Sequence, residues 1–145
     1  MAHRIRSAAA SDLPAILALL EQAGLPSAGV AEHLERFWVL EVDGQVAGAV
    51  GLELYGDSGL LRSLVVRPDL RGQRQGHNLY FHVVNQAMGL SLIELILLTT
   101  TAQDFFAKLG FEVIERDQVP ASMRASSEFS GACPDSAVCM RIPLM

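Results

Sequence analysis

One segment near the middle of the chain constrains the fold more than any other. The segment Leu60–Val66, apolar except for Arg62 and Ser63, has the composition of a β-strand and stops before Pro68. Apolar side chains then recur at helical spacing over about 76–88. The sequence therefore predicts a strand, a short loop and an amphipathic helix in immediate succession.

The loop between this strand and this helix suits a phosphate-bearing ligand. Backbone N–H groups at the start of a helix have no acceptor within the helix, and the helix dipole places positive charge there. Gly72 and Gly76 allow the backbone to approach a ligand closely, and the guanidinium of Arg71 adds positive charge. Glycine-containing turns are common, however, so the spacing alone is equally consistent with an ordinary connection that carries surface arginines.

Strand and helix patterns also alternate through the rest of the chain. Asp43-Gly44 and the turn at 56–59 predict an antiparallel meander of three strands, and Ser11 and Thr101 are expected as helix N-caps. The other expected strands and helices are a strand at 3–6, helices at 11–23 and 28–36, strands at 37–42, 45–54 and 92–98, a helix at 101–108, and strands at 111–115 and 136–142.

The order of these elements is β-α-α-β-β-β-α-β-α-β-β, which predicts an α/β (α+β) fold. We expect one domain over residues 1–145, with a mixed central sheet of about seven strands and flanking helices. The nearly continuous apolar run Leu92–Leu98 is expected in the centre of the sheet. Residues 116–135 form a long polar segment, and a loop of that length is usually either functional or poorly ordered.

Composition excludes several classes of protein. The 145 residues include 11 basic and 16 acidic side chains, for a net charge of −5, so no cationic surface for nucleic acid is expected. No apolar run approaches the roughly 20 residues that span a bilayer. Ser11 and Asp12 interrupt the N-terminal region before any signal-like apolar stretch, which predicts a cytoplasmic protein that is not membrane-bound.

Cys133 and Cys139 are the only cysteines. Two thiols cannot form a disulfide framework, and the histidines lie too far away in the sequence for a zinc-ligand pattern, so no metal is expected. Two interpretations remain open. The cysteines are small packed side chains, or they form a redox or thiophilic pair.

The element order and two motifs resemble the GNAT superfamily of acetyl-CoA-dependent N-acetyltransferases. The motifs are the segment 61–76, with its Arg-Gly-x-x-x-Gly loop, and Phe-Ala-Lys-Leu-Gly-Phe at 106–111. The segments 97–102, 105–111 and 133–140 further resemble the small acetyltransferases encoded in arsenic-resistance operons. The resemblance implies acetyl-CoA as co-substrate and a small-molecule amine as acceptor, such as a toxin or an amine-bearing arsenical. It leaves the oligomeric state open, with a homodimer as one option.

The resemblance also implies which residues bind the cofactor. The pyrophosphate is expected at the loop and helix start, and the pantetheine arm is expected to pair with the strand backbone as an added strand. The residues expected to bind the cofactor are Leu64, Val65, Val66, Arg71, Gly72, Gln73, Arg74, Gln75, Gly76, His77, Thr99 and Phe106. A backbone N–H near Val65 or Val66 is expected to polarise the thioester carbonyl.

The sequence departs from the family pattern at five positions. Arg74 replaces a glycine, Gln75 replaces an aliphatic residue, and Phe106 replaces a tyrosine that protonates the departing thiolate. Leu60 stands where many members carry a glutamate base, and Thr99 stands where an asparagine is frequent. These departures support a second hypothesis, in which the domain is a non-catalytic module that binds coenzyme A or arsenite.

Catalysis would require a base, because an alkylammonium group with a pKa of about 10 is protonated at neutral pH. Glu53, on the strand next to the motif strand, is the first candidate. Glu41, on the preceding strand, is the second.

Overall fold

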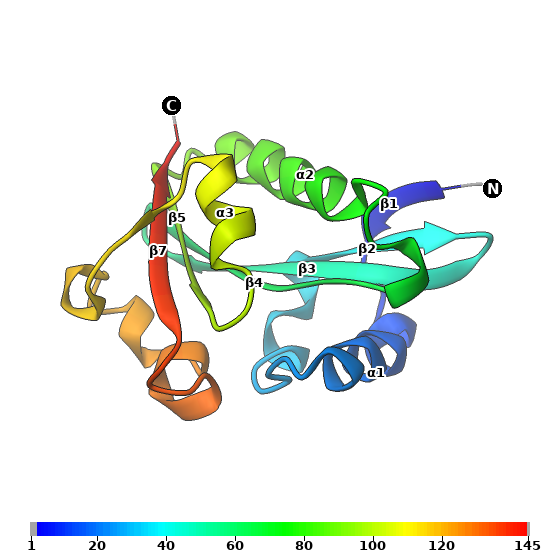
Figure 1. Ribbon diagram of the computed structural model, residues 1–145, viewed down its shortest axis with the longest axis horizontal. Coiled ribbons are helices and arrows are strands. Elements are labelled where there is room, and N and C mark those ends of the chain that lie inside the picture. Colours follow the sequence, from blue (N-terminus) through cyan, green and yellow to red (C-terminus); the bar gives the residue numbers. More distant parts are fainter. Residues whose placement is uncertain (1–2, 145) are drawn as a thin grey trace.

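A mixed sheet of seven strands organises residues 3–144, the part of the chain that the computed structural model describes (Figure 1). The sheet order is β1-β2-β3-β4-β5-β7-β6, and only β4 and β5 run parallel as neighbours. This arrangement confirms the expected fold class, the meander and the central position of the apolar strand. The strands are β1 (His3–Ser7), β2 (Phe37–Val42), β3 (Gln45–Tyr55), β4 (Ser58–Val66), β5 (Glu94–Thr99), β6 (Glu112–Val113) and β7 (Val138–Pro143).

Three α-helices cover the two faces of the sheet. Helices α2 (Gln75–Gly89) and α3 (Gln103–Leu109) lie on one face, and α1 (Leu13–Ala23) lies on the other (Figure 1). Strand β2 shows why both faces are buried, because successive side chains point to opposite sides. Trp38 and Leu40 pack in the same cluster as the apolar side chains of α2, while Phe37 and Val39 pack with those of α1.

The expected helix boundaries differ from the observed ones where side-chain hydrogen bonds decide them. Helix α1 is preceded by a 3₁₀ turn (Ala10–Asp12), because the Asp12 carboxylate, rather than Ser11, accepts the N–H of Ala9 at 2.7 Å. Helix α3 begins at Gln103, because the hydroxyl of Thr99, rather than that of Thr101, accepts the N–H of Ala102 at 2.9 Å.

Two expected elements are shorter than the sequence pattern indicated. The helix expected at 28–36 is a 3₁₀ helix, η2 (Ala31–Arg36), preceded by Gly29 at a positive φ of 83°. The strand expected at 111–115 is the two-residue strand β6, which pairs only with β7 at the edge of the sheet. Its two side chains are exposed, so little burial stabilises a longer strand.

The long polar segment 116–135, called the excursion below, is ordered. It contains the turns η4 (Arg116–Gln118) and η5 (Met123–Ala125) and the π-helical turn η6 (Glu128–Ala132). Val119 and Met123 are buried against Leu60 of β4 and Ile96 of β5. The excursion therefore covers, beside α1, the part of the sheet face that no α-helix covers (Figure 1).

The sheet opens between its two parallel strands. In the described part of the chain, β4 pairs with β5 only over Ser58–Leu60, opposite Glu94–Ile96. Further along β4 the register with β3 shifts, so that two residues of β4, Ser63 and Leu64, stand opposite one residue of β3. Ser63 takes a left-handed conformation with φ of 61°. Such a bulge bends a strand, so β4 diverges from β5 beyond this point.

Candidate active site

A cavity of about 790 Å³ occupies the opening between β4 and β5. Residues 61–66 of β4 and residues 97–102, at the end of β5 and after it, form two of its walls. Arg71 and Gly76 line it on the face covered by α2. Residues 23–26, at the end of α1 and just after it, and part of the excursion line it on the opposite face. The cavity therefore contacts elements on both faces of the sheet.

The structure brings many of the sequence-predicted cofactor residues to this cavity. Those that line it are Leu64, Val65, Val66, Arg71, Gly76, Thr99 and Phe106. Arg71 Nε donates a hydrogen bond to the carbonyl oxygen of Val66 at 3.2 Å, which fastens the loop to the end of β4. The hydroxyl of Thr99 accepts a backbone N–H, as described above.

The other predicted cofactor residues lie on the loop and at the start of α2 without lining the cavity. Gly72, Gln73 and Arg74 are exposed, and the His77 ring packs edge-on against Phe105 with centroids 5.0 Å apart. Gln75 does not line the cavity, and its Nε2 bonds His3 Nδ1 at 2.9 Å. Its side chain is therefore engaged within the protein, and its backbone N–H at the start of α2 remains the group predicted to contact the cofactor.

Arg74 occupies a backbone conformation that favours glycine. It precedes α2 with a φ of 64°, and a left-handed conformation is unfavourable for a residue with a Cβ. This position is the one where the family pattern places glycine. The Arg74 side chain is exposed, so it does not obstruct the cavity.

The wall at the end of β5 is aromatic. Phe106 is buried in edge-on contact with Phe105 and Phe111, at centroid distances of 5.1 and 5.4 Å. A phenyl ring has no proton to donate. This wall can therefore exclude water and pack against an apolar arm, but it cannot protonate a leaving group.

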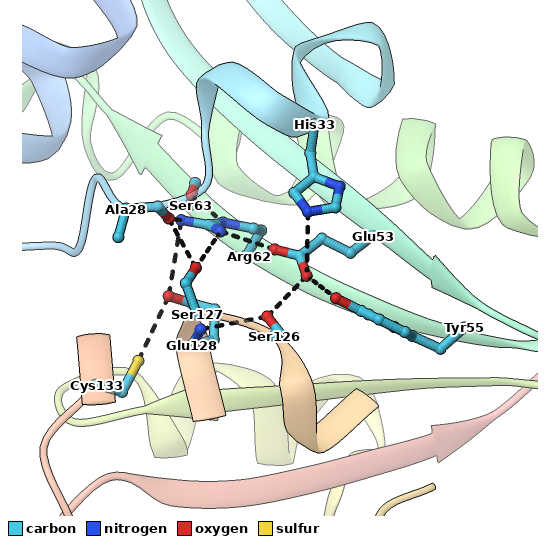
Figure 2. A network of polar contacts seen from close by, with 10 residues as sticks. All are labelled: Ala28, His33, Glu53, Tyr55, Arg62, Ser63, Ser126, Ser127, Glu128 and Cys133. Atoms are coloured by element: carbon cyan, nitrogen blue, oxygen red, sulfur yellow. Dashed lines mark hydrogen bonds and ion pairs between the residues drawn. The ribbon is translucent and has the colours of Figure 1, made fainter. Parts of the chain in front are cut away.

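Glu53, the first candidate for the base, is fully buried and does not line the cavity. Its carboxylate accepts hydrogen bonds from Arg62 Nη1 at 2.7 Å, from Ser126 Oγ at 2.7 Å and from the hydroxyl of Tyr55, and His33 Nε2 lies 3.7 Å away (Figure 2). Burial alone raises the pKa of Glu53, but these hydrogen bonds outweigh it and hold the pKa below its usual value. Its position favours a structural role.

Arg62 connects three parts of the chain that are distant in sequence. Besides Glu53, its guanidinium donates to the carbonyl oxygen of Ala28 at 2.7 Å, and it contacts Ser127 Oγ at 3.5 Å (Figure 2). A Cβ at Gly29 would lie 2.9 Å from this guanidinium and 2.6 Å from Ser127 Oγ, so the network also needs glycine there. The positive charge of Arg62 is thus already neutralised by groups of the protein.

Glu128 is a cavity residue that the sequence analysis missed. It belongs to η6, is 4% exposed and lines the cavity. Burial, the largest influence, raises its pKa. The available signal was its place as the only carboxylate between Asp117 and Asp135 in a long segment expected to be functional.

Glu41, the second candidate for the base, does not line the cavity. It pairs with Arg6 at 2.8 Å and with Arg4 at 3.0 Å, where β2 meets β1. The hydrogen bond from Arg6 is the main reason that the pKa of Glu41 lies below its usual value. The expectation of a catalytic Glu41 is corrected to an ion pair between neighbouring strands.

Both cysteines are buried free thiols. Cys133 lines the cavity, whereas Cys139 lines a different pocket beside β6. Burial raises the pKa of Cys133 to about 12 and that of Cys139 to about 11. Across residues 3–144, no three His, Cys, Asp or Glu side chains gather to hold a metal ion, and no helix is long and apolar enough to cross a membrane.

The sequence and the fold identify the family. Residues 33–113, more than half of the chain, match the family described as acetyltransferase (GNAT) domain. The chain therefore belongs to the GNAT acetyltransferases.

Curated relatives include two enzymes named amino-acid acetyltransferase. The one from Neisseria meningitidis is 31% identical over 136 residues, which cover 88% of this chain and 31% of the relative. The one from Edwardsiella ictaluri is 32% identical over 133 residues, which cover 86% of this chain and 30% of the relative. The chain thus spans about a third of the length of these relatives.

Solved structures agree with the family. N-acetylglutamate synthase from Neisseria gonorrhoeae, complexed with coenzyme A and N-acetyl-glutamate, superposes with a TM-score of 0.86 at 27% identity, covering 100% of this chain and 36% of that one. A Mycobacterium tuberculosis protein in complex with coenzyme A gives a TM-score of 0.83 at 27% identity, covering 98% of this chain and 99% of that one.

Proposed function

We propose that this chain is an acetyl-CoA-dependent N-acetyltransferase that acts on the amine of a small molecule. The observation that carries the proposal is the cavity between β4 and β5. It extends from the loop before α2, which suits phosphate groups, on one face of the sheet to buried polar side chains on the other. When bound there, acetyl-CoA supplies the activated acetyl group as a thioester. The proposal treats the chain as one domain and, from the composition and cysteine content, places the activity in the cytoplasm.

The residues around the cavity fit coenzyme A. Gly76 lines the cavity, and only the ring of Phe105 lies within 4 Å of the position that its Cβ would take, at 3.7 Å, so the start of α2 is open to a ligand. The N–H groups of Gln75, Gly76 and His77 have no acceptor within the helix and can donate to phosphate oxygens. Arg71 adds positive charge, and Gly72, Gln73 and Arg74 form the exposed side of the same loop.

The β4 wall would hold the extended part of the cofactor. The backbone of Leu64 and Val66 can pair with an extended arm because the ladder with β5 has already ended. The N–H of Val65 or Val66 polarises a carbonyl placed beside it. Phe106 and Thr99 would line the cavity at the thiol end of the cofactor. Because Phe106 has no hydroxyl group, the departing sulfur would take its proton from water and not from a tyrosine.

The acceptor is proposed to be an amine of the amino-acid type. The relatives named amino-acid acetyltransferase support this class. The resemblance of three segments to enzymes of arsenic-resistance operons adds toxins and amine-bearing arsenicals to the candidates, and it rests on the sequence segments alone.

Two observations favour a second candidate function, a non-catalytic module that binds coenzyme A. Phe106 cannot donate a proton, and Glu53 is saturated with hydrogen bonds. Measuring free coenzyme A release across a panel of amino acids and simple amines separates the two. We expect release that depends on one class of amine. Thermal stabilisation by coenzyme A without release for any amine would support the binding module instead.

A further inference from the structure

We propose that Glu128 is the catalytic base that removes the proton from the acceptor ammonium group. This inference rests on the proposed transferase function and deepens it. In the described part of the chain, Glu128 is the carboxylate that both lines the cavity and is almost completely buried. It lies on η6 of the excursion, where its carboxylate points toward Arg62 and Cys133 (Figure 2).

The hydrogen bonding of Glu128 is incomplete. Its Oε2 accepts one weak hydrogen bond, from Cys133 Sγ at 3.5 Å, and lies 3.8 Å from Arg62 Nη2, beyond hydrogen-bond reach. Its Oε1 receives no hydrogen bond from the residues that the structure describes. Glu53 accepts three hydrogen bonds at normal or short distances and is closed off from the cavity. Glu128 is therefore the carboxylate with an oxygen free for a proton.

The charges around Glu128 favour an ammonium group. The strands contribute Arg62 and Glu53, the excursion contributes Glu128 and the Cys133 thiol, and His33 of η2 faces Glu53 rather than Glu128. Two carboxylates share the one guanidinium of Arg62, which leaves an excess of negative charge among these three side chains. Each nitrogen of the Arg62 guanidinium already donates a hydrogen bond within the protein, to Ser63, Glu53 or Ala28, so Arg62 is engaged there rather than with a carboxylate of the acceptor.

The neighbours also prepare Glu128 to exchange protons. Burial raises its pKa most, the nearby Glu53 raises it further, and Arg62 and the Cys133 hydrogen bond lower it. The net pKa lies above the usual value, which brings a carboxylate closer to neutral pH, where a general base works best. The pKa of Cys133 is about 12, so its thiol stays protonated and remains a donor.

The proposed step balances in protons and electrons. One N–H bond of the ammonium group breaks, its electron pair stays on nitrogen, and Glu128 becomes neutral. Nitrogen then forms a bond to the thioester carbonyl carbon while the carbon–sulfur bond breaks, with its electron pair leaving on sulfur. Nitrogen loses its second proton to sulfur through water, and Glu128 returns its proton to solvent.

The test compares Glu128→Gln with the wild type and with Glu112→Gln, a matched change on the exposed strand β6. Rates are measured against pH with one accepted amine, and coenzyme A affinity and thermal stability are measured in parallel. We expect Glu128→Gln to lower kcat/KM for the amine about 10²–10⁴-fold at neutral pH. The deficit should shrink toward a pH of about 10, where the amine loses its own proton. Glu112→Gln should behave as the wild type.

Stability gives a readout that a merely structural role would not produce. Because the folded-state pKa of Glu128 lies above its unfolded value, ionised Glu128 destabilises the fold above that pKa. Glu128→Gln should therefore be as stable as the wild type or more stable at neutral and alkaline pH, with unchanged coenzyme A affinity. A structural Glu128 would instead give a less stable variant.

A second variant, Cys133→Ala, tests the role of Glu128 even if Glu128→Gln does not fold. Cys133→Ala removes the donor that lowers the pKa of Glu128, so the acidic limb of the rate profile should move to higher pH. An unmoved limb, or near wild-type activity and pH profile in Glu128→Gln, would overturn the assignment while leaving the transferase function intact. A wild type that transfers to no amine would overturn both.

Discussion

The two thiols of Cys133 and Cys139 show how burial limits cysteine chemistry. Metal and arsenic ligation require the thiolate, and burial, the largest influence on both, raises their pKa values to about 12 and 11. The thiols also line different pockets, and no third metal-ligating side chain joins them in residues 3–144. These facts favour the interpretation of both cysteines as packed side chains.

We therefore predict that arsenite neither binds the reduced protein tightly nor is needed for acetyl transfer. The measurement is a calorimetric titration with arsenite, with transfer rates compared in its presence and absence. Cys133→Ser and Cys139→Ser serve as controls. Tight binding that both substitutions abolish would contradict the prediction and restore the thiophilic pair.

The candidate site could be predicted from the sequence only in part, and Glu53 and Glu128 show why. The sequence places Glu53 beside the motif strand but does not show that its carboxylate pairs with Arg62. That pairing depends on the register of β3 and β4, which puts the two side chains on one face of the sheet with an offset of two residues. Glu128 reaches the cavity because a long segment without periodicity folds back. Hydrophobic periodicity carries no information about such a path.

At the scale of elements, the junction between β4 and α2 carries the cofactor proposal. Gly76 lines the cavity, and a Cβ there would make only ordinary contacts. We predict that Gly76→Val weakens coenzyme A binding while Gly76→Ala, the matched control, binds almost normally, because only the branched side chain extends into the cavity. Both variants should keep the fold.

Calorimetric titration with coenzyme A and circular dichroism check this pair. Equal affinity of the valine variant and the wild type would remove Gly76 from the binding site. A loss of affinity in the alanine variant as large as that in the valine variant would point to backbone freedom, rather than space, as the reason for glycine.

The order of the elements could be predicted because apolar side chains recur along them at the spacing of a strand or of a helix. The ends of the elements could not be predicted in this way. The expected strands and helices exist, but the helix starts at Leu13 and Gln103 depend on the hydrogen bonds of Asp12 and Thr99. Neighbouring Ser and Thr residues offer the same chemistry in the sequence. Which of these side chains accepts the backbone N–H at the helix start depends on the turn that the backbone makes, and only the packed structure defines that turn.

At the scale of the whole molecule, the Glu53–Arg62 pair joins the sheet to the excursion and to residue 28. Breaking a buried ion pair by removing one partner leaves an uncompensated charge and costs about 3–5 kcal/mol. We predict that Glu53→Gln lowers the free energy of unfolding by about this amount and loosens the excursion. Glu41→Gln, which alters a partly exposed pair, should cost less.

Urea denaturation and amide hydrogen exchange measure the two effects. The pKa of Glu53 is lower in the folded state than in the unfolded state. Its ionised carboxylate therefore contributes fully to the free energy of unfolding above the unfolded-state pKa, and this contribution is lost as the pH falls through the folded-state pKa. The difference between the wild type and Glu53→Gln should therefore narrow in acid. A difference that stays constant down to strongly acidic pH would show that the lost stability does not come from the ionised carboxylate.

The divergence of β4 from β5 also affects how well the molecule is protected against aggregation. A free strand edge normally invites pairing with a strand of another chain, and proteins protect such edges by covering or bending them. Here the edge lies inside the sheet, where the bulge at Ser63 bends it and α3 and the excursion wall it in. The protein's own elements therefore cover this edge, so the feature that opens the sheet for binding is also protected against pairing with a strand of another chain.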